Sequence, residues 1–161
     1  MNETDNLSAF AYPARIAPDG HGRLLVTFRD LPEAATDGAD VAEARHMAVD
    51  CLSEALLHRA ADGDMPTSSK PRRGEVVVAP YANVALKLGL IAATRRHGLT
   101  PSALAKSLGI DRKDARRLLD PGHRSKAEGL TDALAAAGVR VEVVLRVDRT
   151  IASGATRRTV G

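Results

Sequence analysis

The sequence predicts an α+β protein in two parts, a small sheet with one helix followed by a helical unit. Apolar residues alternate with a period of two over residues 10–28 and recur at spacings of three and four from residue 41 onward. The charge also changes sign along the chain. Residues 1–69 hold 12 acidic and 5 basic side chains, whereas residues 70–161 hold 8 and 18. This split predicts an acidic module joined to a basic one.

Composition limits what each part can be. The chain has 161 residues, of which 44% are hydrophobic but only 2% are aromatic, so its cores must consist of Ala, Val and Leu. The one cysteine, Cys51, has no partner for an internal disulfide. No signal-like segment opens the chain, and no apolar run approaches the roughly 20 residues that cross a bilayer. We therefore expect a cytoplasmic protein that does not enter the membrane.

The first part predicts a β-hairpin, a helix and a strand, in that order. The alternating apolar positions are Phe10, Tyr12, Ala14 and Ile16 before a turn at 19–22, and Leu24, Val26 and Phe28 after it. Residues 29–33 are expected to be irregular and to lead through residues 36–38 to Asp40, which is suited to cap a helix over 41–62. After a loop at 65–74, three consecutive valines predict a buried strand at 76–78. We assign residues 8–80 to this β-β-α-β domain.

The second part predicts four helices and a closing strand. The start and stop signals are, in order, His97 and Gly98, Thr100 and Pro101, Gly109, Asp111, Pro121 and Gly122, and Gly138. They delimit helices that begin near residues 84, 101, 112 and 126. Alternating valines predict a terminal strand over 139–147. We assign residues 81–148 to this domain and expect 149–161 to be a disordered tail.

Residues 101–119 have the spacing of a DNA-binding helix-turn-helix. Ala105 lets two helices cross closely, and Gly109 suits a left-handed turn. Ile110 and Leu118 are expected to be buried on the inner side. Ala115 stands where such motifs commonly have Val or Ile. The segment is therefore interpreted as a helix-turn-helix with a small residue in the second helix.

A basic face on the second helix of this motif indicates DNA binding. The residues expected to contact DNA are Thr100, Ser102, Arg112, Lys113, Arg116, Arg117, Arg124 and Lys126. The helix start at Thr100 and Ser102 offers free amides to a phosphate. Arg124 and Lys126 would bind another phosphate. The four basic residues within 112–117 would face the major groove, where Arg donates two hydrogen bonds to guanine. The alternative is a solvated basic face on a helical hairpin.

The sequence predicts no catalytic residue, metal site or cofactor. Phosphate-binding, dinucleotide-binding, zinc-protease and nucleophile-elbow motifs are all absent. The histidines are scattered without the spacing of metal ligands: His21, His46, His58, His97 and His123. Only His123, beside the basic residues, has a functional interpretation, as a phosphate contact. Cys51 lies on an apolar helix stripe and is interpreted as a packed core thiol.

Two groups of residues carry a resemblance to a known family. In the first half they are Phe28, Asp30, Leu31 and Pro32, then Thr36, Asp37 and Gly38, then Val41, Ala42, Glu43 and Ala44. In the second half the order and spacing of residues 78–90, the helix-turn-helix and the closing strand match. Over most of residues 8–148 the chain resembles the HicB antitoxins of bacterial type II toxin–antitoxin systems, in the subgroup with a C-terminal helix-turn-helix. Glu33 departs from the glycine that many members have there.

The resemblance implies a partial RNase H-like fold with a further short strand for the first domain, and a HicA-type toxin as its partner. That toxin is a small basic protein that cleaves mRNA using a histidine, and an acidic domain suits it because opposite charges speed and orient docking. The candidate toxin-binding residues are Asp30, Glu33, Asp37, Asp50 and Glu54. A solvated acidic face is their alternative role. RNase activity is not implied, because the predicted strands over 10–16 and 24–28 contain no carboxylates to bind metal ions.

The family also represses its own operon, as a dimer or higher assembly. The apolar face of the predicted terminal strand offers a way to pair two copies across a two-fold axis. Two helix-turn-helix units joined in this way would contact half-sites about 34 Å apart on operator DNA. A strand that closes within its own chain is the alternative.

The leading hypothesis is therefore a non-enzymatic antitoxin and autorepressor. The alternative is a stand-alone helix-turn-helix transcriptional regulator with an N-terminal ligand-sensing domain, which the scarcity of aromatic residues disfavours. A third hypothesis, an RNA-processing enzyme of RNase H type, is disfavoured by the missing carboxylates.

Overall fold

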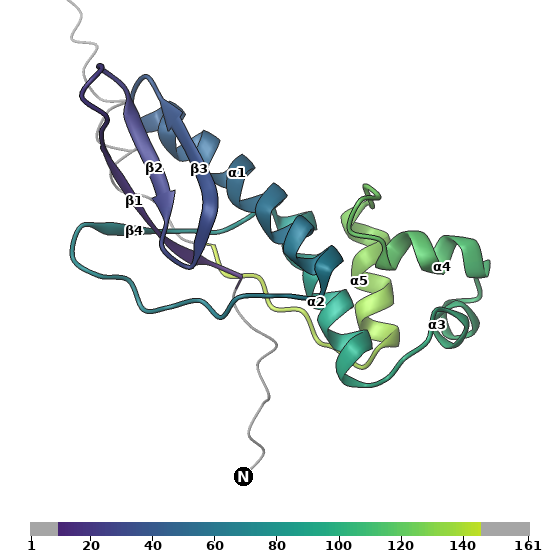
Figure 1. Ribbon diagram of the computed structural model, residues 1–161. Helices are drawn as coiled ribbons and strands as arrows, with labels where there is room; N and C mark the ends of the chain where they lie inside the picture. The colour runs from purple at the N-terminus through teal and green to yellow at the C-terminus, as the bar shows by residue number, and fades with distance from the viewer. Residues whose placement is uncertain (1–9, 146–161) are drawn as a thin grey trace, which may run out of the picture.

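The structure is a computed structural model that describes residues 10–145. The elements in chain order are β1 (Tyr12–Pro18), β2 (Leu24–Phe28), β3 (Leu31–Gly38), α1 (Val41–Asp62), β4 (Glu75–Val78), α2 (Ala82–Arg96), α3 (Pro101–Leu108), α4 (Arg112–Leu119) and α5 (Ala127–Ala136). Figure 1 shows α1 lying along the sheet, with α3, α4 and α5 grouped at the opposite end of the molecule. The predicted α+β class, with a sheet followed by helices, is confirmed.

The four strands form one antiparallel sheet in the order β3-β2-β1-β4. The predicted alternation holds, because Tyr12 and Ala14 of β1 and Val26 and Phe28 of β2 are all buried on the face that α1 covers. Thr27, between Val26 and Phe28, is exposed on the other face, whereas Pro13, between Tyr12 and Ala14, is buried as well. The period-two pattern thus places the first core on one side of the sheet.

Residues 31–38 form a strand, so the prediction of an irregular stretch over 29–33 was wrong from Leu31 onward. Phe28 pairs with Leu31 across a two-residue turn, but the next pair is Thr27 with Ala35, which leaves residues 32–34 as a bulge in β3. Because of this bulge the buried positions fall at Leu31, Ala34 and Gly38 instead of alternating. The regular pattern that identifies a strand is therefore missing from the sequence.

Helix α1 begins where the capping chemistry predicts. The Asp40 side chain accepts a hydrogen bond from the Glu43 amide at 2.9 Å. The small side chains Ala44 and Ala48 let the helix lie close to the sheet, where they are fully buried. Gly38 completes this approach, because a β-carbon there would lie less than 3.0 Å from backbone atoms of Glu43 and Ala44. A glycine at position 38 is thus a packing requirement.

The cores of the two parts share α2. Val84, Leu88 and Ile91 pack into the first core with α1 and the sheet. Leu90, on another side of the same helix, is fully buried in a second core with Leu104 of α3 and with side chains of α5. The two packed units therefore meet along one continuous helix.

The segment after α5 departs from the predicted closing strand. Over 139–145 the chain has no regular secondary structure, and the rest of the predicted strand lies outside the described residues. Val139 and Val141 pack against the second core, whereas Val143 and Leu145 are 76% and 90% exposed. Alternation alone does not make a strand, which needs a neighbouring strand to accept and donate hydrogen bonds. The predicted tail, 149–161, also lies outside the described residues.

Candidate functional site

Helices α3 and α4 form the predicted helix-turn-helix. Gly109 ends α3 with φ of 65°, a left-handed conformation that glycine adopts without a steric clash because it has no β-carbon. Ala105 is 6% exposed and Ala115 is fully buried, so the two helices pack through small side chains. Leu118 is partly buried against the second core. Ile110 is 37% exposed, contrary to the prediction, because it lies in the turn outside both helices.

Both helices begin at capping residues identified in the sequence. The Thr100 hydroxyl accepts a hydrogen bond from the Ala103 amide at 3.2 Å, and the Asp111 carboxylate accepts one from the Lys113 amide at 2.6 Å. Ser102, in the first turn of α3, is exposed. The start of α3 is therefore open to solvent, with its capping hydroxyl already engaged.

The predicted basic residues of the second helix and of the following loop are all exposed. They are Arg112, Lys113, Arg116 and Arg117 on α4, with Arg124 and Lys126 between α4 and α5. We call these six residues the basic face. Arg117 has an ion pair with Asp114 at 3.0 Å, while the other five make no ion pair within residues 10–145. Their charges are thus available to an anionic partner.

A buried lysine behind the basic face was not predicted from the sequence. Lys87 of α2 is 3% exposed, and its ammonium donates hydrogen bonds to the carbonyls of Arg117 at 3.1 Å, Asp120 at 2.8 Å and His123 at 2.6 Å. Burial lowers the pKa of Lys87. The sequence feature that could have indicated it is a lysine between Val84 and Leu88, two apolar positions on the buried side of α2.

The predicted acidic residues have different environments. The Asp30 carboxylate is almost buried and accepts hydrogen bonds from the amide, at 2.8 Å, and the hydroxyl of Ser69. Burial alone would raise the pKa of Asp30, but the hydrogen bonds from Ser69 hold it below its usual value. Asp37 forms an ion pair with Arg23 near the far end of the sheet. These two residues do not share a surface with the helix carboxylates.

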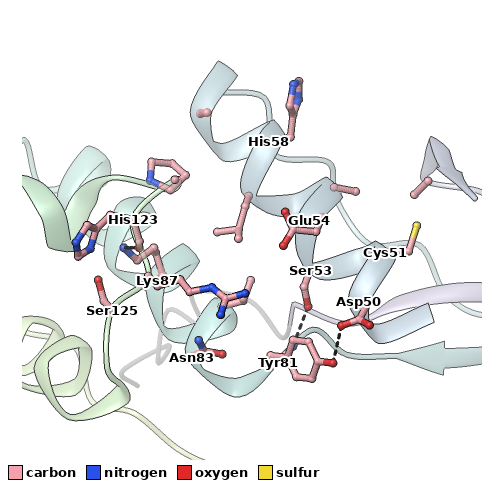
Figure 2. Close-up of a pocket in the computed structure, with 18 of the residues that line it drawn as sticks. Asp50, Cys51, Ser53, Glu54, His58, Tyr81, Asn83, Lys87, His123 and Ser125 are labelled. Carbon is pink, nitrogen blue, oxygen red and sulfur yellow. Dashed lines mark hydrogen bonds between the residues drawn. The ribbon is translucent and has the colours of Figure 1, made fainter. Parts of the chain in front are cut away.

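The other three acidic residues line one open groove. Glu33, Asp50 and Glu54 contribute to a cavity of about 1110 Å³ between α1 and the loop after α4. Figure 2 shows Asp50, Glu54 and His58 on α1, with Lys87 and His123 on the side that belongs to the helical unit. The groove therefore has an acidic wall and a basic wall.

Two of these carboxylates accept hydrogen bonds from side chains of the same chain. Asp50 accepts a hydrogen bond from the Tyr81 hydroxyl at 2.6 Å. Arg59 donates to Glu33 at 2.7 and 3.0 Å, and these hydrogen bonds lower the pKa of Glu33. Glu54 is exposed on α1. The acidic wall thus combines a solvent-facing carboxylate with two that are already oriented.

The described part of the chain holds neither a grouping of metal ligands nor a membrane-spanning helix. Among residues 10–145, no three His, Cys, Asp or Glu side chains are grouped so that they could hold a metal ion. No helix in this range is long and apolar enough to cross a membrane. Cys51 packs against the first core, where burial raises the pKa of its thiol, which agrees with the interpretation as a core residue.

The sequence of the sheet-bearing unit matches antitoxins of bacterial toxin–antitoxin systems. Residues 11–89 match the model of a family described as the HicB-like antitoxin of bacterial toxin–antitoxin systems. The match covers the sheet, α1 and the first half of α2.

Named relatives extend the similarity into the helical unit. The antitoxin HicB of Escherichia coli strain K12 is 30% identical over 135 residues, which are 83% of this chain and 98% of that protein. Antitoxin HicB 2 of Photorhabdus laumondii subsp. laumondii is 32% identical over 134 residues, 83% of this chain and 94% of that protein. The antitoxin HicB of Pseudomonas fluorescens is 30% identical over 122 residues, 74% and 84% of the two chains. The chain belongs to the HicB-like antitoxin family, and membership supports an antitoxin role with a toxin as partner.

Proposed function

We propose that this protein is an antitoxin that neutralises a HicA-type, mRNA-cleaving toxin by direct binding and represses its own operon through the helix-turn-helix. Family membership supports the first activity. The observation that carries the second is the basic face, because exposed arginines and lysines without ion pairs are what DNA phosphates and guanine edges attract. Both partners belong to the bacterial cytoplasm, where we place the protein. Its action is binding, without catalysis or a cofactor.

The acidic wall of the groove is our candidate surface for the toxin. Glu33, Asp50 and Glu54 lie on it together, so a basic partner would meet several carboxylates at once. Asp30 and Asp37 remain candidates at a distance from the groove, and binding through them would first require release of Ser69 and Arg23.

Charge reversal tests this surface. Glu54→Lys should slow toxin association by about tenfold, because complementary charge chiefly affects the encounter rate. Glu128→Lys, which makes the same change at an exposed position on α5, should leave the rate within about twofold of wild type. Equal effects from the two variants would refute the groove as the toxin surface.

Self-association supports operator binding in this proposal. Val143, Val144 and Leu145 are 76%, 70% and 90% exposed, and pairing of this segment with the same segment of a second copy would cover them. The resulting dimer would present two helix-turn-helix units to DNA. Replacement of Val143 and Leu145 by Ser should shift the protein toward monomer in sedimentation experiments and weaken operator binding.

A ligand-sensing transcriptional regulator is the second candidate, and the open groove between the two units is the observation that favours it. Tagged purification from the native cell, with intact-mass measurement of what accompanies the chain, distinguishes the two functions. A stoichiometric basic protein of under about 100 residues supports the antitoxin. A homo-oligomer without such a partner, from cells that express the neighbouring reading frame, would favour the regulator.

A further inference from the structure

The buried ammonium of Lys87 lies directly behind the basic face. Its three N–H groups are matched by three carbonyl oxygens, those of Arg117, Asp120 and His123. Arg117 lies in the last turn of α4, and the other two acceptors belong to the loop that leads to Arg124. One side chain of α2 thus fixes both the end of the second helix and the start of the next basic segment.

This arrangement needs the lysine itself. The carbonyls at a helix C-terminus carry partial negative charge and lack partners within the helix, so a buried cation there both satisfies and neutralises them. A buried ammonium is costly unless every donor is used, as it is for Lys87. Replacement by an apolar side chain would remove all three bonds. The Arg117 and Asp120 carbonyls would keep only the backbone amides of Asp120, at 3.4 Å, and of His123, at 3.1 Å. The end of α4 would then lose its fixed orientation relative to α2.

We propose that Lys87 is a positioning residue for sequence-specific DNA binding, which rests on the proposed operator-binding function. The side chain contacts no DNA, because it is 3% exposed and faces the interior between α2 and α4. It holds the end of α4, the loop and Arg124 in the one geometry in which their contacts reach a single DNA site. Specific binding needs this register, whereas non-specific binding depends mainly on charge.

Lys87 extends from the helix that both cores share. It stands one residue before Leu88, which is buried in the first core, and three before Leu90, which is buried in the second. Its hydrogen bonds therefore tie the end of α4 to the helix that joins the two units. Lys87 is also among the residues that line the groove, on the same side as His123.

The experiment compares specific with non-specific DNA binding. Affinities of wild type, Lys87→Met and Lys70→Met are measured for the duplex immediately upstream of the protein's own gene and for a shuffled duplex of equal length. Lys70 is exposed in the loop before β4, so its variant removes the same charge without the three bonds. Hydrogen exchange of the sheet and α1 amides is measured in parallel, to show that the first core is retained.

Lys87→Met should lower the ratio of specific to non-specific affinity by about tenfold or more, as expected for lost hydrogen bonds to a charged group. Exchange should accelerate in α4 and in residues 120–126 but not in the sheet. Lys70→Met should change both affinities by less than about threefold and leave the ratio unaltered. Loss of overall stability alone would not change this ratio in the folded fraction. Lys87→Arg, which keeps the charge and several donors, should lie closer to wild type than Lys87→Met.

Two results separate the possible failures. If wild type prefers neither duplex, the operator-binding function itself is refuted, and the positioning role with it. If wild type prefers its upstream duplex and Lys87→Met keeps the same ratio, only the role of Lys87 is refuted. Should Lys87→Met fail to fold, Lys87→Gln takes its place, and an unchanged ratio in that variant overturns the proposal equally.

Discussion

The two units of this protein use their charged side chains in opposite ways. In the sheet-bearing unit the carboxylates and arginines pair with one another: Arg29 with Glu75 at 3.0 Å, Arg59 with Glu33 at 2.7 Å, and Arg23 with Asp37. In the helical unit, five of the six residues of the basic face make no ion pair within the described residues. A net charge counted over a segment therefore differs from the charge that a partner meets. In the sheet-bearing unit, many charged side chains are used in ion pairs within the fold. On the basic face, most charges point to solvent.

The largest effects should come from changes that act on one core and spare the other. Leu88→Ala and Leu90→Ala alter residues of the same helix that are buried in the first and second cores respectively. Each should cost about 2 to 5 kcal/mol of unfolding free energy. In hydrogen exchange, the first should expose mainly the sheet amides and the second those of α3 and α5. Identical exchange maps would show that the two units form one cooperative structure.

Next in size are changes to the basic face. Arg116→Ala and Arg117→Ala should each weaken operator binding by about 1 to 3 kcal/mol if the residue contacts a base, with toxin neutralisation unchanged. Arg72→Ala together with Arg73→Ala removes two charges from the exposed loop before β4 and is the matched control. Titration of the operator duplex by fluorescence anisotropy measures both. An equal loss from the control pair would mean that net charge, and not its placement on α4, sets the affinity.

A smaller effect should appear in how the stability of the sheet-bearing unit depends on pH. The side chain of Arg29 and the amide of Arg72 hold the pKa of Glu75 at about 2, below the value of about 4.3 in an unfolded chain. Because the folded pKa is the lower one, this stabilisation is complete above about pH 4.3 and disappears as the pH falls through about 2.

Urea denaturation of wild type and Glu75→Gln across this pH range measures the contribution. Wild type should be the more stable protein at neutral pH, and the gap between the two midpoints should close on acidification. Parallel curves would show that Glu75 takes no part in the pH dependence of folding.

The smallest effect is expected at the Glu33–Arg59 pair. Its side chains are 48% and 27% exposed, so solvent screens the attraction, and Glu33→Gln should cost no more than about 1 kcal/mol in thermal unfolding. The same substitution should still slow toxin association if Glu33 contributes to the acidic wall of the groove. If Glu33→Gln lowered the thermal stability but left the rate of toxin association unchanged, Glu33 would serve the fold alone.

Local chemistry made the helices predictable. The caps at Asp40, Thr100 and Asp111 and the left-handed Gly109 lie where the sequence placed them, because each depends on residues within one turn of chain. The exposure of the four basic residues on α4 followed from helical periodicity in the same way.

Features that depend on distant partners were not predictable. The β3 bulge has no sequence period, and the groove exists only because α1 packs beside the loop after α4. The role of Lys87 depends on three acceptors that lie 30 to 36 positions away in the chain. The strand expected over 139–147 lacked a partner that the sequence could specify.

The bulge in β3 bears on how copies of this protein meet. β3 is an outer strand of the sheet, and outer strands are templates on which other chains add strands and aggregate. Here Pro32 has no amide hydrogen to offer, and the bulge at 32–34 interrupts the row of donors and acceptors along the edge. The other outer strand, β4, is only four residues long. Both borders of the sheet are thus poor templates for uncontrolled polymerisation, which leaves ordered assembly to surfaces elsewhere on the molecule.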